Sequence, residues 1–186
     1  MKTTALALAA VAAFASLSGC TTTYTPQPGE PLARLRVVTV PPPQYATDVT
    51  WASFVDVVDI STCPKPVTTL VKTGVLSATN VQRLGMPGLP TGGGLVTEFA
   101  VPAGRPLALL FFMGAGRWSC QVQMAWTPRV GADYEAQYHL SADKNRCVIP
   151  LRELKPTRTG VQRVEAAGVR KWNSSQPCGV EPPGAK

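Results

Sequence analysis

Short runs of alternating apolar and polar residues make up most of the chain, and no window keeps a 3.6-residue apolar period for three helical turns. The clearest run is WSCQVQMAW, residues 118–126, where every second side chain is apolar or aromatic: Trp118, Cys120, Val122, Met124 and Trp126. A period of two is typical of a β-strand with one buried face. The pattern therefore predicts a half-buried strand in which the Cys120 side chain points into a core.

Two later segments repeat this alternation. In DYEAQYHL, residues 133–140, one face carries Tyr134, Ala136, Tyr138 and Leu140, and in RCVIPLRE, residues 146–153, one face carries Cys147, Ile149 and Leu151. Cys147 is thus also expected to point inward. Further strands are expected at residues 34–40, 51–60, 67–72, 95–102, 106–113 and 161–166.

These short strands are separated by Pro and Gly, which favour turns and edge positions. They predict an all-β fold, an immunoglobulin- or transthyretin-like β-sandwich, with a small β-barrel as the alternative. The continuously apolar segment PLALLFFM, residues 106–113, indicates a central strand.

The N-terminal segment has the layout of an export signal. Lys2 precedes an apolar run over residues 5–17, which is too short to span a membrane comfortably, and small residues follow it. LSGC, residues 17–20, resembles the lipobox of bacterial lipoproteins. The resemblance implies that residues 1–19 are removed and that Cys20 becomes the first mature residue, carrying a diacylglycerol and an acyl chain such as palmitate. Several acyl chains give an effectively permanent membrane anchor.

The same resemblance predicts the location. In Gram-negative lipoproteins an Asp after the lipidated cysteine commonly retains the protein in the inner membrane, and this chain has Thr21 there. We therefore expect an outer-membrane protein facing the periplasm. Residues 20–33 are rich in Thr and Pro and predict an extended tether, followed by the β-domain at 34–172 and a C-terminal tail at 173–186.

With Cys20 lipidated, four cysteines remain: Cys63, Cys120, Cys147 and Cys178. An even number in an oxidising compartment predicts two disulfides, for which three connectivities are possible. The shared core phase of Cys120 and Cys147 favours that pair and leaves Cys63 with Cys178. In a plain meander the first and third strands are too far apart for a disulfide, so the two strands are expected to be adjacent or to face each other across the sandwich. Zinc is disfavoured, because CxxC and CxxH pairs are absent and His139 is the single histidine.

A second resemblance covers residues 118–149. Cys120, the segment WTPRVGADYEAQYHL and Cys147 are similar to a group of proteobacterial outer-membrane lipoproteins, in which a cysteine strand precedes aromatic-x-Pro-x-x-Gly-x-Asp-Tyr-Glu and a second cysteine strand. The group carries no known activity, so the resemblance implies compartment and fold alone.

Residues suited to catalysis are scattered. His139 is expected on the solvent face, and Ser141 and Asp143 follow it only in a strand-and-turn context. Alternation places Asp56 and Asp59 on opposite strand faces, as solvated side chains rather than a carboxylate pair. We therefore expect no enzymatic activity, no cofactor and no metal.

The segment GMPGLPTGGG, residues 85–94, is the most unusual after the signal. Its glycines Gly92, Gly93 and Gly94 lack the Lys and Ser or Thr of a phosphate-binding loop. It is either a plain flexible connection or a mobile recognition loop that displays Met86 and Leu89.

The formal net charge is +7, but the basic residues are dispersed, and together with the predicted compartment this excludes a nucleic-acid partner. The leading hypothesis is a non-enzymatic, lipid-anchored envelope protein that acts as an accessory or adaptor and has a protein partner. The alternative is a lipoprotein that binds a glycan or small ligand, for which Trp51 and Trp172 are open candidates as stacking residues.

Overall fold

A computed structural model describes residues 24–40, 51–63, 68–75, 83–90, 95–115, 118–140, 146–176 and 178. These residues form strands and no helix, so this part of the chain offers no helical segment that could cross a membrane. The strands are β1 (Leu32–Thr39), β2 (Trp51–Asp59), β3 (Thr68–Val75), β4 (Leu95–Pro102), β5 (Leu107–Ala115), β6 (Trp118–Trp126), β7 (Asp133–Leu140), β8 (Cys147–Val148), β9 (Leu151–Thr157), β10 (Gly160–Glu165) and β11 (Arg170–Lys171).

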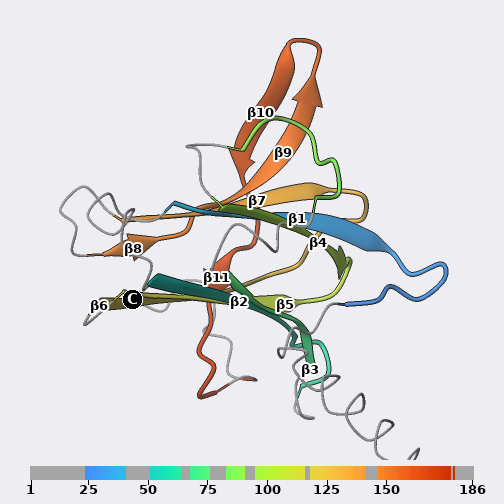
Figure 1. Cartoon of the computed structure of the whole chain (residues 1–186). Coiled ribbons are helices and arrows are strands. Elements are labelled where there is room, and N and C mark those ends of the chain that lie inside the picture. Colours follow the sequence, from blue (N-terminus) through green and yellow to red (C-terminus); the bar gives the residue numbers. More distant parts are fainter. Residues whose placement is uncertain are drawn as a thin grey trace, which may run out of the picture.

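The strands form two sheets that pack face to face (Figure 1). One sheet has six strands in the order β10-β9-β7-β1-β4, with β8 also paired to β7, and the other has the order β11-β6-β5-β2-β3. The predicted β-sandwich is therefore confirmed, and because the two sheets stay separate the barrel alternative is not the fold. Strand β5 lies between β2 and β6, which confirms the central position expected from its apolar sequence.

Strand β1 lies inside the six-stranded sheet. It pairs antiparallel with β4, where Leu35 is opposite Phe99, and parallel with β7, where Leu35 is opposite Tyr134. Parallel neighbours require a long connection between them, and here that connection contains most of the second sheet. The strands on either side of β1 thus come from distant parts of the chain.

The main core fills the space between the sheets, where the inward positions of both are apolar. The largest fully buried apolar side chains include Trp126, Tyr138 and Phe111. The rings of Phe111 from β5 and Tyr138 from β7 stack across the core with centroids 5.0 Å apart. The alternation predicted for β6 and β7 is confirmed at the described side chains, since Met124 and Tyr134 are also buried.

Two disulfides join the elements that the sequence favours. Cys120 of β6 and Cys147 of β8 belong to different sheets, and their Cα atoms are 6.1 Å apart. Their bond therefore crosses the sandwich, as the expected pairing requires. Cys63 and Cys178, with Cα atoms 5.4 Å apart, fasten the C-terminal tail to the segment after β2.

The segment 146–153 differs from the single strand expected. It divides into β8 and the start of β9, and both pair with β7, where His139 is opposite Val148 and Ala136 is opposite Leu151. Pro150 lies at the break, because proline has no N–H to donate to a ladder. The inward phase of Ile149 and Leu151 is nevertheless preserved, and both are buried.

Candidate functional site

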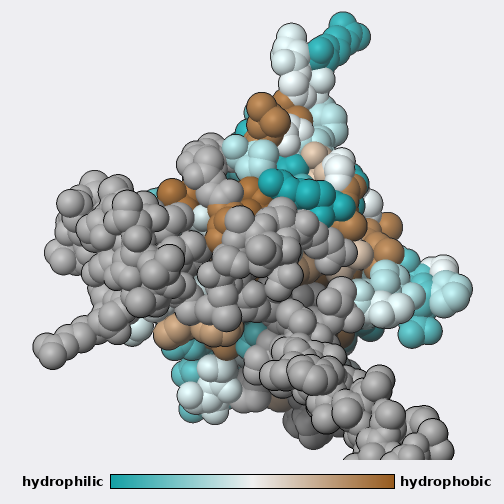
Figure 2. All heavy atoms as spheres, viewed as in Figure 1, coloured by the Kyte–Doolittle hydropathy of each residue, from teal (hydrophilic) through white to brown (hydrophobic). Residues whose placement is uncertain are grey.

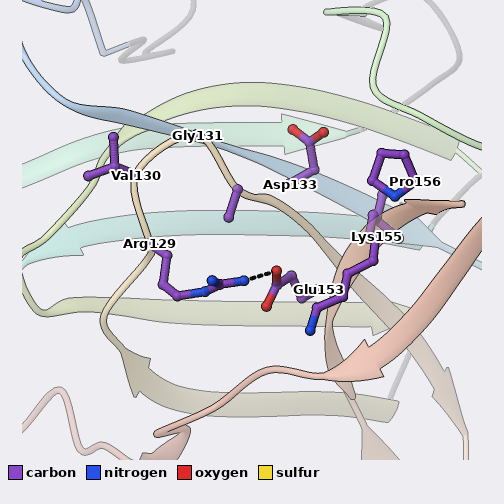
Figure 3. A pocket seen from close by; sticks show the side chains of 9 residues that line it. Arg129, Val130, Gly131, Asp133, Glu153, Lys155 and Pro156 are labelled. Atoms are coloured by element: carbon purple, nitrogen blue, oxygen red, sulfur yellow. Dashed lines mark hydrogen bonds and ion pairs between the residues drawn. The ribbon is translucent and has the colours of Figure 1, made fainter.

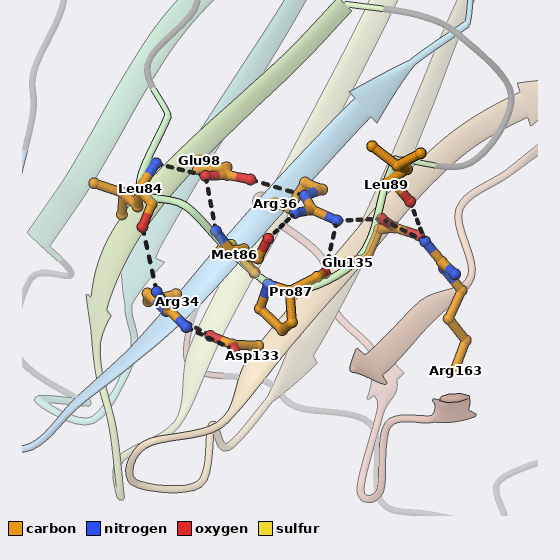
Figure 4. Close-up of polar contacts among 10 residues, drawn as sticks. All are labelled: Arg34, Arg36, Leu84, Met86, Pro87, Leu89, Glu98, Asp133, Glu135 and Arg163. Atoms are coloured by element: carbon orange, nitrogen blue, oxygen red, sulfur yellow. Dashed lines mark hydrogen bonds and ion pairs between the residues drawn. The ribbon is translucent and has the colours of Figure 1, made fainter. Parts of the chain in front are cut away.

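Charged side chains gather on the outer face of the six-stranded sheet, and all of them except Arg34 and Arg163 are buried where solvated residues would be expected. They form an ionic cluster of three guanidinium and three carboxylate groups: Arg34, Arg36, Glu98, Asp133, Glu135 and Arg163. Residues 83–90, called the strap here, lie over this cluster (Figure 4). The side chains of Arg36 and Glu98 are each 2% exposed and that of Glu135 is 1% exposed.

Arg36 of β1 is the centre of the cluster. Its Nε lies 2.9 Å from Oε1 of Glu98 on β4, and its Nη1 lies 3.1 Å from Oε2 of Glu135 on β7. Arg163 of β10 pairs with the second oxygen of Glu135 at 2.8 Å. Buried charges are tolerated only when they are paired and hydrogen-bonded, and these are.

The strap is held by its backbone. Arg36 donates to the carbonyl oxygens of Met86 at 2.8 Å and Pro87 at 3.3 Å, and Glu98 accepts from the N–H groups of Leu84 and Met86. Charged side chains, rather than the backbone of a neighbouring strand, thus supply hydrogen-bond partners for the backbone of the strap. Such charge-assisted hydrogen bonds are stronger than neutral ones.

The two ends of the strap are fixed by the outer members of the cluster. Arg34 donates to the Leu84 carbonyl at 3.3 Å while it holds Asp133 through two bonds of 2.6 and 2.8 Å. At the other end, Arg163 donates to the Leu89 carbonyl at 2.5 Å. The strap therefore crosses the sheet from β1 and β4 to β10.

The electrostatics of Glu98 follow from these contacts. Burial by itself would raise the pKa of this carboxyl, but the bonds from the Leu84 N–H, the Arg36 guanidinium and the Met86 N–H outweigh it. The net result is a pKa of Glu98 below its ordinary value, so the charged form that holds the strap is favoured in the folded protein.

The predicted display of Met86 is wrong. Its side chain is 6% exposed, because the strap is drawn onto the sheet by the backbone bonds on both sides of it. Leu89 is 87% exposed, as expected for a displayed residue. Gly88, with φ of +73°, lies directly against β10, since a Cβ there would meet Val161 at 3.1 Å. The remaining predicted loop residues Gly92, Gly93 and Gly94 lie outside the described residues.

The β9–β10 hairpin stands clear of the sandwich next to the strap (Figure 1). Strand β9 pairs with β7 only up to Leu154, and from Lys155 to Thr157 it pairs with β10 alone. All residues from 155 to 160 are exposed. Figure 2 shows a hydrophilic end on this projection and hydrophobic side chains nearer the body. The tip includes the cations Lys155 and Arg158.

An open cleft of about 450 Å³ lies where β9 extends past the start of β7 (Figure 3). One wall is the turn Arg129–Ala132, and the other is β9 from Glu153 to Pro156. Arg129 forms an ion pair with Glu153, and attraction to that carboxylate raises the pKa of the Arg129 guanidinium. Charged residues of both signs line the cleft, and two of them, Arg129 and Glu153, are paired with each other.

The other residues considered for chemistry are His139, Ser141, Asp143 and Asp59. His139 is half-buried on β7, and Ser141 and Asp143 lie outside the described residues. Asp59 is 5% exposed rather than solvated as predicted, because its carboxylate accepts from the Ser61 N–H at 2.9 Å and lies 3.2 Å from Arg105 Nε. Among the described residues no group of three His, Cys, Asp or Glu side chains could hold a metal ion.

The ionic cluster was missed by the sequence reasoning, although a signal is present. Arg36, Glu98 and Glu135 each occupy an outward position in a strand whose core-facing side chains are mainly apolar, and pattern alone assigns such outward residues to solvent. Cys20 lies outside the described residues, so its lipidation stays a prediction. Comparison with protein-family models, curated proteins and solved structures finds no match for this chain, and its function is therefore argued from the geometry of the strap and hairpin.

Proposed function

We propose that this protein is a non-enzymatic, lipid-anchored adaptor of the bacterial envelope, and that it binds a protein partner through Leu89 and the β9–β10 hairpin. The observation that carries the proposal is the 87% exposure of Leu89 on a backbone fixed to a buried ionic cluster. An exposed leucine alone is ordinary. An exposed leucine whose main chain is tied to the base of a projecting hairpin is arranged for contact.

Fixation of the strap reduces the entropy that binding would cost. The Leu89 carbonyl is bound by Arg163, and Gly88 packs against Val161 of the hairpin. A partner that covers Leu89 would therefore meet a preorganised surface, which is the general route to affinity from a small contact area.

The composition of this surface also suits a protein partner. Leu89 and the half-buried Val161, which lies against the neighbouring Gly88, supply apolar surface, and the exposed Arg158 lies in the turn of the hairpin as a polar margin. Protein interfaces commonly combine a desolvated apolar core with a polar rim. A cation at the margin would favour a partner with an acidic surface and increase the rate of encounter.

Absence of enzymatic chemistry is inferred from how the charges are used. Within the described residues, the buried members of the ionic cluster bind each other and the strap backbone, leaving them no role as acid or base. The glycan alternative is weaker, because Trp126 and Trp172 are both buried and offer no open ring face to a sugar. The side chains of Trp51 and Trp118 lie outside the described residues.

Site-specific photo-crosslinking tests the proposed surface. A photoreactive amino acid would replace Leu89 or Arg158 in the full-length chain, in intact cells with the anchor retained. A third position, Gln121, is exposed on the outer face of the other sheet and is the matched control. We expect one discrete adduct from positions 89 and 158 and none from position 121. Adducts of equal yield at all three positions, or none at 89 and 158, would contradict the proposal.

The anchor is tested separately through Cys20. Because the thioether has no other attachment point, Cys20→Ser should abolish incorporation of a palmitate analogue and leave the unprocessed precursor in the inner membrane. Metabolic labelling followed by membrane fractionation measures both effects. Continued labelling of the variant would show that the lipobox prediction is wrong.

A further inference from the structure

The C-terminal tail covers an apolar strip on the outer face of the five-stranded sheet. Trp172, which is 7% exposed, packs there in a cluster separate from the main core: Val58, Ile60, Ala108 and Ala125. The half-buried Leu110 and Cys63 border this cluster. The tail, called here residues 172–178, thus acts as a cover for apolar side chains that would otherwise face solvent.

The tail is held by backbone pairing, by the buried Trp172 side chain and by a disulfide. Strand β11 is only two residues long and pairs with β6 through Arg170 opposite Ala125 and Lys171 opposite Met124. Beyond Trp172, the Ser174 N–H donates to Oε1 of Gln123 at 2.6 Å. Residues 173–176 are exposed. The disulfide between Cys63 and Cys178 is the covalent link at the far end of the tail.

The two disulfides differ in access to solvent. Cys178 is an exposed residue and Cys63 is half-buried, whereas Cys147 is half-buried and Cys120 is buried. Cys120 is 5% exposed and its disulfide crosses the interior between the sheets. Thiol–disulfide exchange needs direct approach of a thiolate to a disulfide sulfur, so the outer disulfide should react first.

We propose that Cys63–Cys178 is a reversible redox site, opened by a dithiol reductant, and that its reduction releases Trp172 and the tail from the sheet. A thiolate of the dithiol attacks Sγ of Cys178, the Cys63–Cys178 bond breaks, and Cys63 leaves as a thiolate. The second thiol of the reductant then attacks its own sulfur in the mixed disulfide and releases Cys178. Two electrons pass from the dithiol, which becomes a cyclic disulfide, and its two protons end on the two cysteines.

The consequence is local because the main core keeps its own disulfide. Cys120–Cys147 still joins the two sheets, and the stacked rings of Phe111 and Tyr138 lie between the sheets, on the opposite face of β5 from Ala108 and Trp172. Opening the outer bond therefore changes which surface the folded domain presents: the strip at Val58 would be covered before reduction and accessible after it.

Graded reduction of the full-length chain tests this site. Purified protein in detergent would be pulsed with dithiothreitol and quenched with a mass-labelled alkylating reagent, and peptide mapping would count each cysteine. Cys63 and Cys178 should be labelled at least about tenfold faster than Cys120 and Cys147, because exchange depends on access to the sulfur. Equal labelling rates for the two pairs would overturn the proposal.

Hydrogen exchange shows whether the Cys63–Cys178 disulfide holds the tail on the sheet or is only a reactive bond at the surface. After selective opening, backbone amides of residues 170–176 should exchange faster while those of β5 and β6 away from Ala125 stay protected. The double variant Cys63→Ser with Cys178→Ser should show the same increase without reductant. If the outer bond opens and residues 170–176 remain as protected as before, the tail is held by its other contacts and the proposal is wrong.

Discussion

Replacing Arg36 by Met tests the idea that the strap is held by buried charge. The substitution keeps a long side chain of similar reach and removes the guanidinium that contacts Glu98 and Glu135. Both carboxylates would lose a charged partner, and the carbonyl oxygens of Met86 and Pro87 would lose their donor. The strap should then loosen while the core between the sheets stays intact.

The size of the effect follows from what remains. Removing one partner of a buried ion pair costs about 3–5 kcal/mol, because the other charge is left uncompensated. Here Glu135 keeps Arg163, and Glu98 keeps the N–H groups of Leu84 and Met86. We therefore expect the lower end of that range, about 3 kcal/mol in the free energy of unfolding.

Urea unfolding monitored by circular dichroism, with backbone hydrogen exchange of the strap amides, measures this prediction. The matched control is Arg152→Met, since Arg152 pairs with the 75% exposed Glu165 at 3.5 Å on the same sheet. Loss of such a surface pair should change stability by less than about 1 kcal/mol. Adding Glu98→Gln to Arg36→Met should cost less than the sum of the single changes, because it removes a charge that was already stranded.

A small effect of Arg36→Met on stability would contradict a role for buried charge in holding the strap. If Arg36→Met destabilises the protein no more than Arg152→Met does, and the amides of Leu84 and Met86 exchange as slowly as before, the strap does not depend on the ionic cluster.

Three further predictions concern the same region. The stabilising contribution of charged Glu98 should be complete above about pH 5 and decline as the pH falls, because the pKa of Glu98 in the folded protein is below its ordinary value and protonation removes this contribution; urea midpoints between pH 6 and 3 should show a shallower decline in Glu98→Gln. Gly88→Ala should destabilise by more than about 1 kcal/mol in thermal or urea unfolding, since the position has positive φ and the new Cβ would press on Val161. Met86→Ser should cost at least about 2 kcal/mol because the side chain is buried, whereas Leu89→Ser should stay within about 0.5 kcal/mol and reduce only partner capture in the crosslinking assay.

The fold could be predicted from the sequence because the apolar–polar alternation that indicates it is a local pattern within each strand. The alternation of Cys120, Met124 and Trp126 depends only on which face of one strand meets the core, and each strand carries its own copy of that information. Because Cys120 and Cys147 both occupy core-facing positions of their strands, the same alternation also predicted a long-range contact, their disulfide. The break at Pro150 was less visible, since the apolar phase continues across it.

The ionic cluster and strap could not be predicted in the same way, because their contacts are polar and join residues far apart in the sequence. The partners of Arg36 are 62 and 99 residues away, and no local pattern distinguishes an outward charge in solvent from one beneath a strap. The Gly- and Pro-containing segment was recognised as unusual, but its lack of regular structure suggested mobility. The hydrogen bonds described for it come from side chains of β1, β4 and β10, which are distant in sequence.

The position of β1 also determines when the molecule can fold. The first strand of the domain has its neighbours in β4, which begins at Leu95, and β7, which begins at Asp133. A growing chain that ends before these strands offers β1 nothing to pair with, and closing such long loops slows formation of native contacts. The six-stranded sheet can therefore be completed only late in synthesis. For a chain predicted to leave the cytoplasm, this delay would keep the polypeptide threadable until its last strands emerge on the other side of the membrane.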